Sequence, residues 1–169
     1  MSTNLCIFIT LGLPLLICYY NIMFLNKKDQ ENLWTNNGKN IVKYGSKLRL
    51  FYKFSIIFST IAGLYLMYYL TYKINTKSIF SFDYNSYGHL FIEISLLVFI
   101  GFSLLWLPAF YSRIISIKFV LFMVSMGSLL LFLSLLSIEK TDSYDYVAIF
   151  CAGLLFFQHF FMDFLIWSY

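Results

Sequence analysis

Residues Tyr146–Tyr169 read YVAIFCAGLLFFQHFFMDFLIWSY, an apolar run in which His159 and Asp163 are the only ionisable residues besides tyrosine and cysteine. A helix rises 1.5 Å per residue, so a run of this length crosses the hydrocarbon core of a bilayer, which is about 30 Å thick. The run therefore predicts a membrane-spanning helix that carries a polar pair in apolar surroundings.

Four more apolar runs of comparable length precede this one, at residues 5–25, 54–72, 89–111 and 119–138. The composition agrees with a membrane location: 60% of the 169 residues are hydrophobic and 12% are charged. Soluble domains average about 45–50% apolar and about 25% charged residues. We expect an all-α integral membrane protein, a single membrane domain built as a bundle of about five transmembrane helices.

The first run is expected to be an uncleaved anchor helix. Residues 1–4 carry no basic side chain, whereas a signal peptide begins with a basic region. Pro14, two residues after Gly12, predicts a kink, which membrane helices tolerate when neighbours satisfy the freed carbonyl group.

The one sizeable polar segment is the basic loop at residues 26–50, in which Asn36-Asn37-Gly38 predicts a turn. Lysines then recur at every fourth position: Lys39, Lys43 and Lys47. This spacing predicts a short basic amphipathic helix at the membrane surface. Two interpretations stay open: the lysines bind acidic lipid headgroups, or they only set the topology while their side chains extend to water.

Basic residues favour one side of the membrane. If loop 26–50 and the connection at 112–118 share a side, that side holds nine basic residues: Lys27, Lys28, Lys39, Lys43, Lys47, Arg49, Lys53, Arg113 and Lys118. The other side holds Lys73, Lys77 and Lys140. Cytoplasmic loops are enriched in Lys and Arg, so we expect the N-terminus outside and the C-terminus inside.

Two runs carry faces of small residues, which let helices approach closely in lipid. The first face comprises Ser55, Ser59 and Gly63, and the second comprises Ser125, Gly127 and Ser128. Both faces are predicted helix-packing contacts.

His159 and Asp163 are four residues apart, so they share a helical face and lie within reach of a direct hydrogen bond. Asp163 would then fix the tautomer of His159, as in a proton relay, while Gln158 is a neighbouring polar group expected to point partly away. The alternative is a structural pair that holds the bundle in register. Charged groups in lipid usually face a bundle interior or a water-filled path.

His89 and Glu93 repeat the same spacing. In the expected topology Glu93 lies about 14 Å from the depth of His159, which is too far for a shared metal site. Glu93 remains a candidate for an ion path, His89 is expected at the interface, and no metal site is expected.

No phosphate-binding loop, zinc-protease motif or channel-filter sequence occurs, and we expect no cofactor. An enzyme is the less favoured reading, and nucleic acid is not an expected partner because aromatic and basic residues do not interleave. Two functions stay open. The chain is either a structural or accessory subunit of a larger membrane complex, held by other subunits or by self-association, or a small channel or proton/ion transporter that uses His159, Asp163 and Glu93.

Overall fold

The computed structural model describes residues 3–23, 27–74, 85–112 and 114–168. These residues are nearly all helical and no strand occurs among them, which confirms the expected all-α class. In chain order the elements are α1 (Thr3–Ile7), η1 (Phe8–Gly12), α2 (Leu13–Met23), α3 (Lys27–Thr35), α4 (Lys39–Tyr44), α5 (Ser46–Tyr72), α6 (Asn85–Ser112), α7 (Ile117–Leu136), α8 (Ser143–Phe157) and η3 (Gln158–Trp167), where η marks π-helical backbone. Residues 75–84, which lie between two predicted runs and include Lys77, are outside the described residues.

Four helices are long and apolar enough to cross a membrane: Ser46–Tyr72, His89–Ser112, Ile117–Leu136 and Ser143–Trp167. The first predicted run supplies a shorter apolar stretch, Thr3–Cys18, so the described chain supports four long spans where the sequence predicted five. Helix α5 also begins eight residues before the predicted start at residue 54. A hydropathy pattern identifies only the part of a helix that is apolar enough for lipid. The helix itself can extend further, because lysine side chains on its surface reach into the headgroup layer.

Elements α1, η1 and α2 form one continuous helix from Thr3 to Met23. The π-helical turn at Phe8–Gly12 ends just before Pro14, the second residue of α2. A proline lacks the N–H group that would bond to the carbonyl four residues earlier, and a local π-helical adjustment is one way in which membrane helices accommodate that loss.

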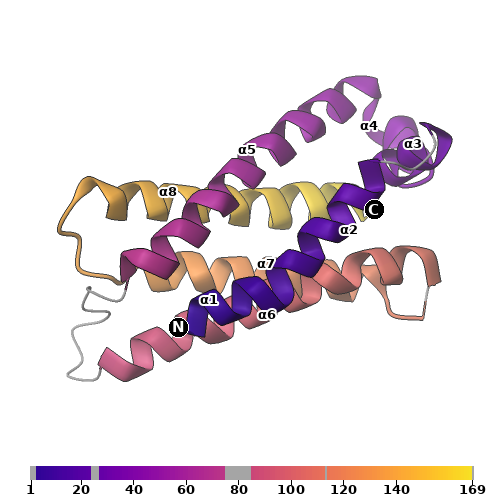
Figure 1. Cartoon of the computed structure of the whole chain (residues 1–169). Helices are drawn as coiled ribbons and strands as arrows, with labels where there is room; N and C mark the ends of the chain where they lie inside the picture. The colour runs from indigo at the N-terminus through magenta and orange to yellow at the C-terminus, as the bar shows by residue number, and fades with distance from the viewer. Residues whose placement is uncertain (1–2, 24–26, 75–84, 113, 169) are drawn as a thin grey trace.

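The helices are arranged as a ring in which α7 packs between α6 and α8, and α8 packs on α5. Helices α1 and α2 lie along α6, and α1 also contacts α5, which closes the ring. Helix α5 begins at the end of the bundle that also holds α3, α4 and the C-terminus (Figure 1). We call this the basic end, because Lys39, Lys43 and Lys47 lie there on the surface. The opposite end, where α5 stops and α8 starts, is called the far end.

The described residues form three clusters of buried apolar side chains, of which the smallest, Ala109, Val120 and Val124, joins α6 to α7. The largest core joins α1, α5, α6, α7 and α8 through buried residues that include Ile7, Leu66, Ile92, Leu131 and Ala152. The second core lies at the basic end, where Tyr52, Leu121, Met162 and Trp167 are buried together. The polar contacts described below sit beside these cores.

Segment 26–50 differs from its prediction. Asn36, Asn37 and Gly38 form the predicted turn, with φ angles of 49°, 57° and 83°. The predicted amphipathic helix is wrong in extent, because Gly45, with φ of 81° and ψ of 167°, ends α4 after six residues. Lys47 therefore lies on α5.

The polar segment is docked on the end of the chain rather than free on the surface. The indole Nε1 of Trp167 donates to the carbonyl oxygen of Leu33 at 3.0 Å, and Asn36 Nδ2 donates to the carbonyl oxygen of Trp167 at 2.7 Å. The Trp167 ring lies 5.5 Å from each of the rings of Trp106 and Phe110. These contacts hold α3 against the C-terminal turn of η3.

Candidate functional site

The site is built on a change of helix type. Helix α8 continues into η3 at Gln158, and Ser168 N donates to the carbonyl of Asp163 five residues back, at 3.1 Å, as in a π-helix. The wider turn brings residues five apart onto one face. Gln158, expected to point partly away, instead donates from Nε2 to Asp163 Oδ1 at 3.1 Å. π-helical turns occur frequently at functional sites.

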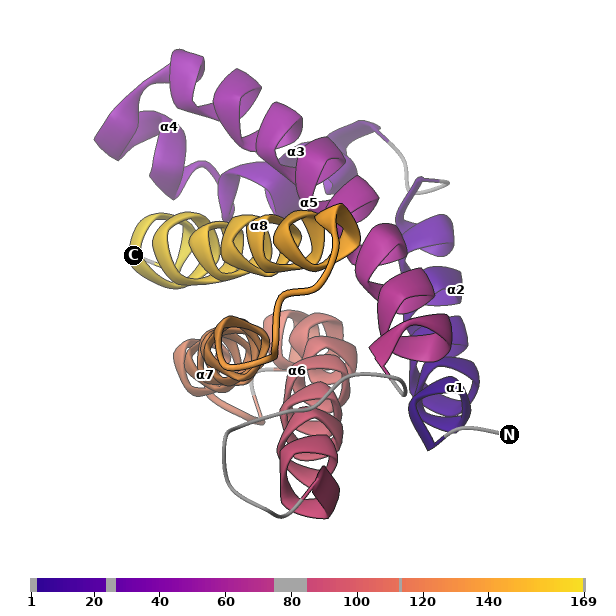
Figure 2. The same cartoon turned by 90° about the vertical axis from the view of Figure 1, so that its left-hand side faces the viewer.

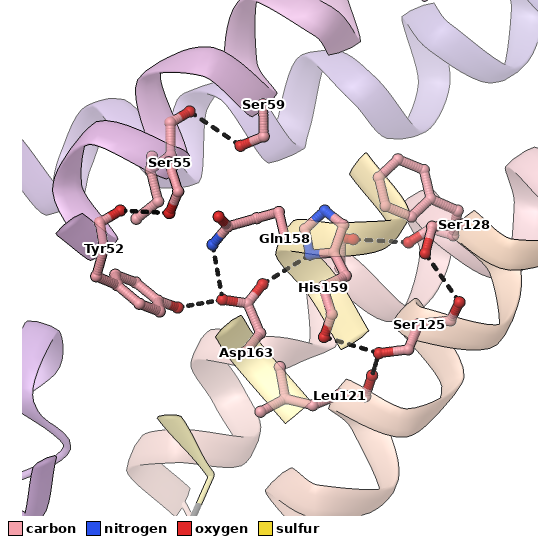
Figure 3. A network of polar contacts seen from close by, with 12 residues as sticks. Tyr52, Ser55, Ser59, Leu121, Ser125, Ser128, Gln158, His159 and Asp163 are labelled. Carbon is pink, nitrogen blue, oxygen red and sulfur yellow. Dashed lines mark hydrogen bonds and ion pairs between the residues drawn. The ribbon is translucent and has the colours of Figure 1, made fainter. Parts of the chain in front are cut away.

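Asp163 is the centre of the cluster (Figure 3). His159 Nδ1 lies 2.7 Å from Asp163 Oδ2, and the hydroxyl of Tyr52 on α5 donates to Asp163 Oδ1. An ionised carboxylate only accepts, so His159 carries its hydrogen on Nδ1 in that state. The side chains of His159 and Asp163 are each 14% exposed. Three donors from two elements therefore surround one carboxylate.

The backbone of His159 is held from α7. Ser125 Oγ, which is fully buried, lies 2.8 Å from the carbonyl oxygen of His159 and 2.7 Å from that of Leu121, both of which accept. On the α6 side, the Phe99 ring meets the His159 imidazole edge to face at 5.1 Å between centroids. His159 is thus held by the Asp163 carboxylate, by the Ser125 hydroxyl that bonds to its backbone carbonyl, and by the Phe99 ring.

The two small-residue faces behave differently. On α7, a Cβ added at Gly127 would lie 2.6 Å from the backbone nitrogen of Phe99, so α6 and α7 are in backbone contact there. Ser125 and Ser128 are buried on the same face. On α5, Ser59 is buried and Ser55 is half-buried, but a Cβ at Gly63 would meet nothing within 4 Å. Of the two faces, the one on α7 brings two helix backbones into contact, whereas the space beside Gly63 on α5 is open.

A second tyrosine–aspartate pair lies at the far end. The Tyr69 hydroxyl donates to Asp145 Oδ1 at 2.6 Å, and both residues are fully buried. The backbone nitrogens of Thr141 and Asp142 donate to Asp145 Oδ2, and Asp142 in turn caps the first turn of α8. Neither Tyr69 nor Asp145 is among the candidate residues predicted from the sequence. The spacing Asp142-x-x-Asp145 is a capping-box pattern that could have identified Asp145 as a residue of the first helical turn, but not Tyr69 as its partner.

The remaining candidates lie apart from the cluster. Glu93 and His89 are half-buried on α6, and no described contact joins either of them to Asp163. Among the described residues, no group of three or more His, Cys, Asp or Glu side chains is placed to hold a metal ion.

No protein-family model matches the chain, and the comparisons with curated proteins and with solved structures give no match either. What the chain does is therefore inferred from the chemistry of its own residues.

Proposed function

We propose that this chain is a structural or accessory subunit of a larger membrane assembly, inserted through all five apolar segments. Large apolar side chains are exposed along every one of these segments. Examples are Leu16, Ile61, Ile94, Leu133 and Phe150, which are between 45% and 65% exposed. Apolar surface of this extent is stable against lipid or against other membrane helices.

One observation carries the subunit proposal: the chain covers little of its own helix surface. In the most hydrophobic stretch of α7, 50% of the residues are buried, but the share is 22% for α5, 22% for α6 and 28% for α8. Helices in lipid associate through packing of such faces. Three of the four long helices therefore offer a face to a partner.

The proposed orientation places the basic end inside and the N-terminus outside. The polar segment and the C-terminus share that end, through the bonds of Trp167 to Leu33 and of Asn36 to Trp167. Epitope tags placed before Met1 and after Tyr169 test this orientation in sealed vesicles. We expect only the tag before Met1 to be accessible from outside, and the reverse result contradicts the orientation.

Site-specific photo-crosslinking tests the subunit proposal. A photoreactive residue is placed at one exposed position per helix, namely Ile61, Ile94, Leu133 or Phe150, with buried Leu155 as the control that contacts only its own chain. We expect one face to give a stoichiometric adduct with a defined second chain and the others to give lipid adducts. Lipid adducts at all four positions, together with a lone monomer in mild detergent, contradict the proposal.

The lysines of the basic end support a second partner, acidic lipid headgroups. Lys39, Lys43 and Lys47 are exposed, and Val42 between them is 90% exposed. An apolar side chain among lysines suits the boundary between headgroups and acyl chains, where each basic residue contributes about 1 kcal/mol of attraction to an acidic surface.

A second candidate function, a proton or ion transporter, is favoured by the cluster at Asp163. An imidazole and a carboxylate 2.7 Å apart inside an apolar helix have the geometry of a proton relay, and each side chain keeps 14% of its surface exposed. Ionisable residues within membrane spans commonly mark ion paths. This candidate uses His159 and Asp163 without Glu93.

Flux measurements in liposomes test the transporter candidate. Purified protein is expected to dissipate a proton or cation gradient, Asp163→Asn to abolish the flux, and Glu93→Gln to retain it. Monodisperse elution of both variants shows that they are folded. A homo-oligomer with flux favours the transporter over the subunit, and the absence of flux at every pH excludes the transporter.

A further inference from the structure

Four buried side-chain atoms in the described part of the chain have no hydrogen-bond partner: Asn4 Oδ1, Asn40 Oδ1, Thr71 Oγ1 and Gln158 Oε1. They fall into two pairs. Asn40 and Gln158 are each connected to one partner of the Tyr52–Asp163 bond: Asn40 lines a hollow that Tyr52 also lines, and Gln158 bonds to Asp163. The other two lie beside Leu70, whose carbonyl accepts from Asn4, next to Tyr69.

The hollow lies at the basic end, between α4 and the first turns of α5. It is lined by Trp34, Thr35, Asn40, Ile41, Gly45, Leu48, Tyr52 and Ile166. Its cavity volume of about 10 Å³ suits a single water molecule. Asn40 is 9% exposed, so its unpartnered oxygen is a buried acceptor in the wall of this hollow.

On the inner side of the Tyr52–Asp163 bond, none of the described residues donates a hydrogen bond to Gln158 Oε1. Gln158 is 2% exposed, and its Nε2 is used on Asp163. Figure 3 shows its amide turned toward α5, which carries Ser55 and Ser59. Both hydroxyls are donated to their own helix, Ser55 to the carbonyl of Tyr52 at 2.8 Å and Ser59 to that of Ile56 at 3.0 Å.

We propose that water enters the bundle from the basic end through this hollow and binds at Asn40 Oδ1 and Gln158 Oε1, on the two sides of the Tyr52–Asp163 bond. Buried acceptors are normally satisfied by protein or by ordered water, and an unsatisfied acceptor in a membrane protein is especially unfavourable. Tyr52 links the two positions, since its side chain lines the hollow and its hydroxyl reaches Asp163.

This inference gives the transporter candidate its substrate class and side of entry: protons, carried by water, reach His159 and Asp163 from the basic end. Only the role of this water in proton transport rests on the proposed transporter function. Hydration of the cluster can be measured whether or not the protein conducts protons. A dry cluster contradicts the hydration proposal, whereas a hydrated cluster without flux contradicts only the transporter function.

Radiolytic footprinting of the whole chain in lipid nanodiscs tests the proposal, because bound water yields hydroxyl radicals beside the residues that it touches. Tyr52 is 7% exposed, and Trp167 is 1% exposed and packed against Trp106 and Phe110. We expect Tyr52 to be oxidised at least about tenfold faster than Trp167, as a residue in contact with bound water would be.

The double variant Asn40→Leu/Gln158→Leu removes both acceptors and is expected to lower the Tyr52 rate at least about fivefold, because an apolar site of this size stays dry. Ser128→Ala is the matched control, since Ser128 is equally buried but donates to the carbonyl of Ser125. Oxidation of exposed Tyr68 reports an intact fold in each variant. Tyr52 oxidised as slowly as Trp167 in the unmodified protein overturns the proposal.

Discussion

Tyr69, on the last turns of α5, donates a 2.6 Å hydrogen bond to Asp145, which is completely buried on the first turn of α8. The same two chain segments are joined again at the basic end, where Tyr52 donates to Asp163. Because α5 and α8 run in opposite directions, Tyr52 near the start of α5 contacts Asp163 near the end of η3. Tyr69 near the end of α5 contacts Asp145 at the start of α8. A polar contact therefore closes each end of this helix pair.

Loss of the Tyr69 hydroxyl should destabilise the protein. In Tyr69→Phe the Asp145 carboxylate loses this donor, and a hydrogen bond to a charged group contributes about 1.5–3 kcal/mol. Thermal unfolding in detergent measures the change. Tyr68→Phe on the same turn of α5, where the ring is 43% exposed, is the control. Equal Tm values for the two variants contradict this prediction.

Tyr52 and Asp163 should be energetically coupled. Tyr52→Phe and Asp163→Leu each remove the bond between them, so the double variant is expected to lose less than the sum of the single losses, by about 0.5–3 kcal/mol. The measurement is the unfolding free energy, in mixed micelles, of the unmodified protein, of the two single variants and of the double variant. The cycle of Tyr52→Phe with Tyr69→Phe, at the other end of α5, is expected to be additive. Additivity in the first cycle would show that the bond contributes nothing.

Gly127→Ala should separate α6 from α7. The new Cβ would lie 2.6 Å from the nitrogen and 2.8 Å from the Cα of Phe99, and backbone atoms cannot turn aside as a side chain can. The expected cost is about 1–3 kcal/mol, typical of an overpacked core. Gly63→Ala, with open space at its Cβ, is expected to be neutral or slightly stabilising. A neutral Gly127→Ala is incompatible with this packing.

Acidic lipid should bind at α4. Native mass spectrometry of protein released from membranes that contain phosphatidylglycerol counts the bound lipids. Lys39→Gln/Lys43→Gln is expected to lose lipid adducts. Lys73→Gln/Lys140→Gln makes the same charge change at the far end, away from α4, and is expected to keep them. Equal loss in both variants points to a general charge effect.

The sequence is sufficient for the class of the fold and for the long helices, because twenty apolar residues in a row have few stable alternatives. It places His159 and Asp163 on one helical face by their spacing alone. It misplaces the start of α5, since residues 46–53 are helical but mix lysine and arginine with apolar side chains. Nothing in the apolar run of Thr3–Cys18 reveals that a π-helical turn precedes Pro14.

The partners of the polar pair are harder to foresee, because they come from other elements. Tyr52 lies 111 residues before Asp163, and Ser125 lies 34 residues before His159. Gln158 joins the cluster only because η3 is π-helical, and no local propensity separates that backbone from an α-helix. Tyr69 looks like any other interfacial tyrosine until α8 covers it.

The two tyrosine–aspartate contacts also fix the length of helix that lies between them. Tyr52 and Tyr69 are 17 residues apart on α5 (52 to 69), and Asp145 and Asp163 are 18 residues apart on α8 and η3 (145 to 163). At 1.5 Å per residue the 17 residues of α5 span about 26 Å, somewhat less than a hydrocarbon core of about 30 Å. A chain fastened at both ends cannot slide its helices to fit a thicker bilayer. The two contacts should therefore keep the register of α5 against α8 and η3 unchanged when the thickness of the surrounding bilayer changes.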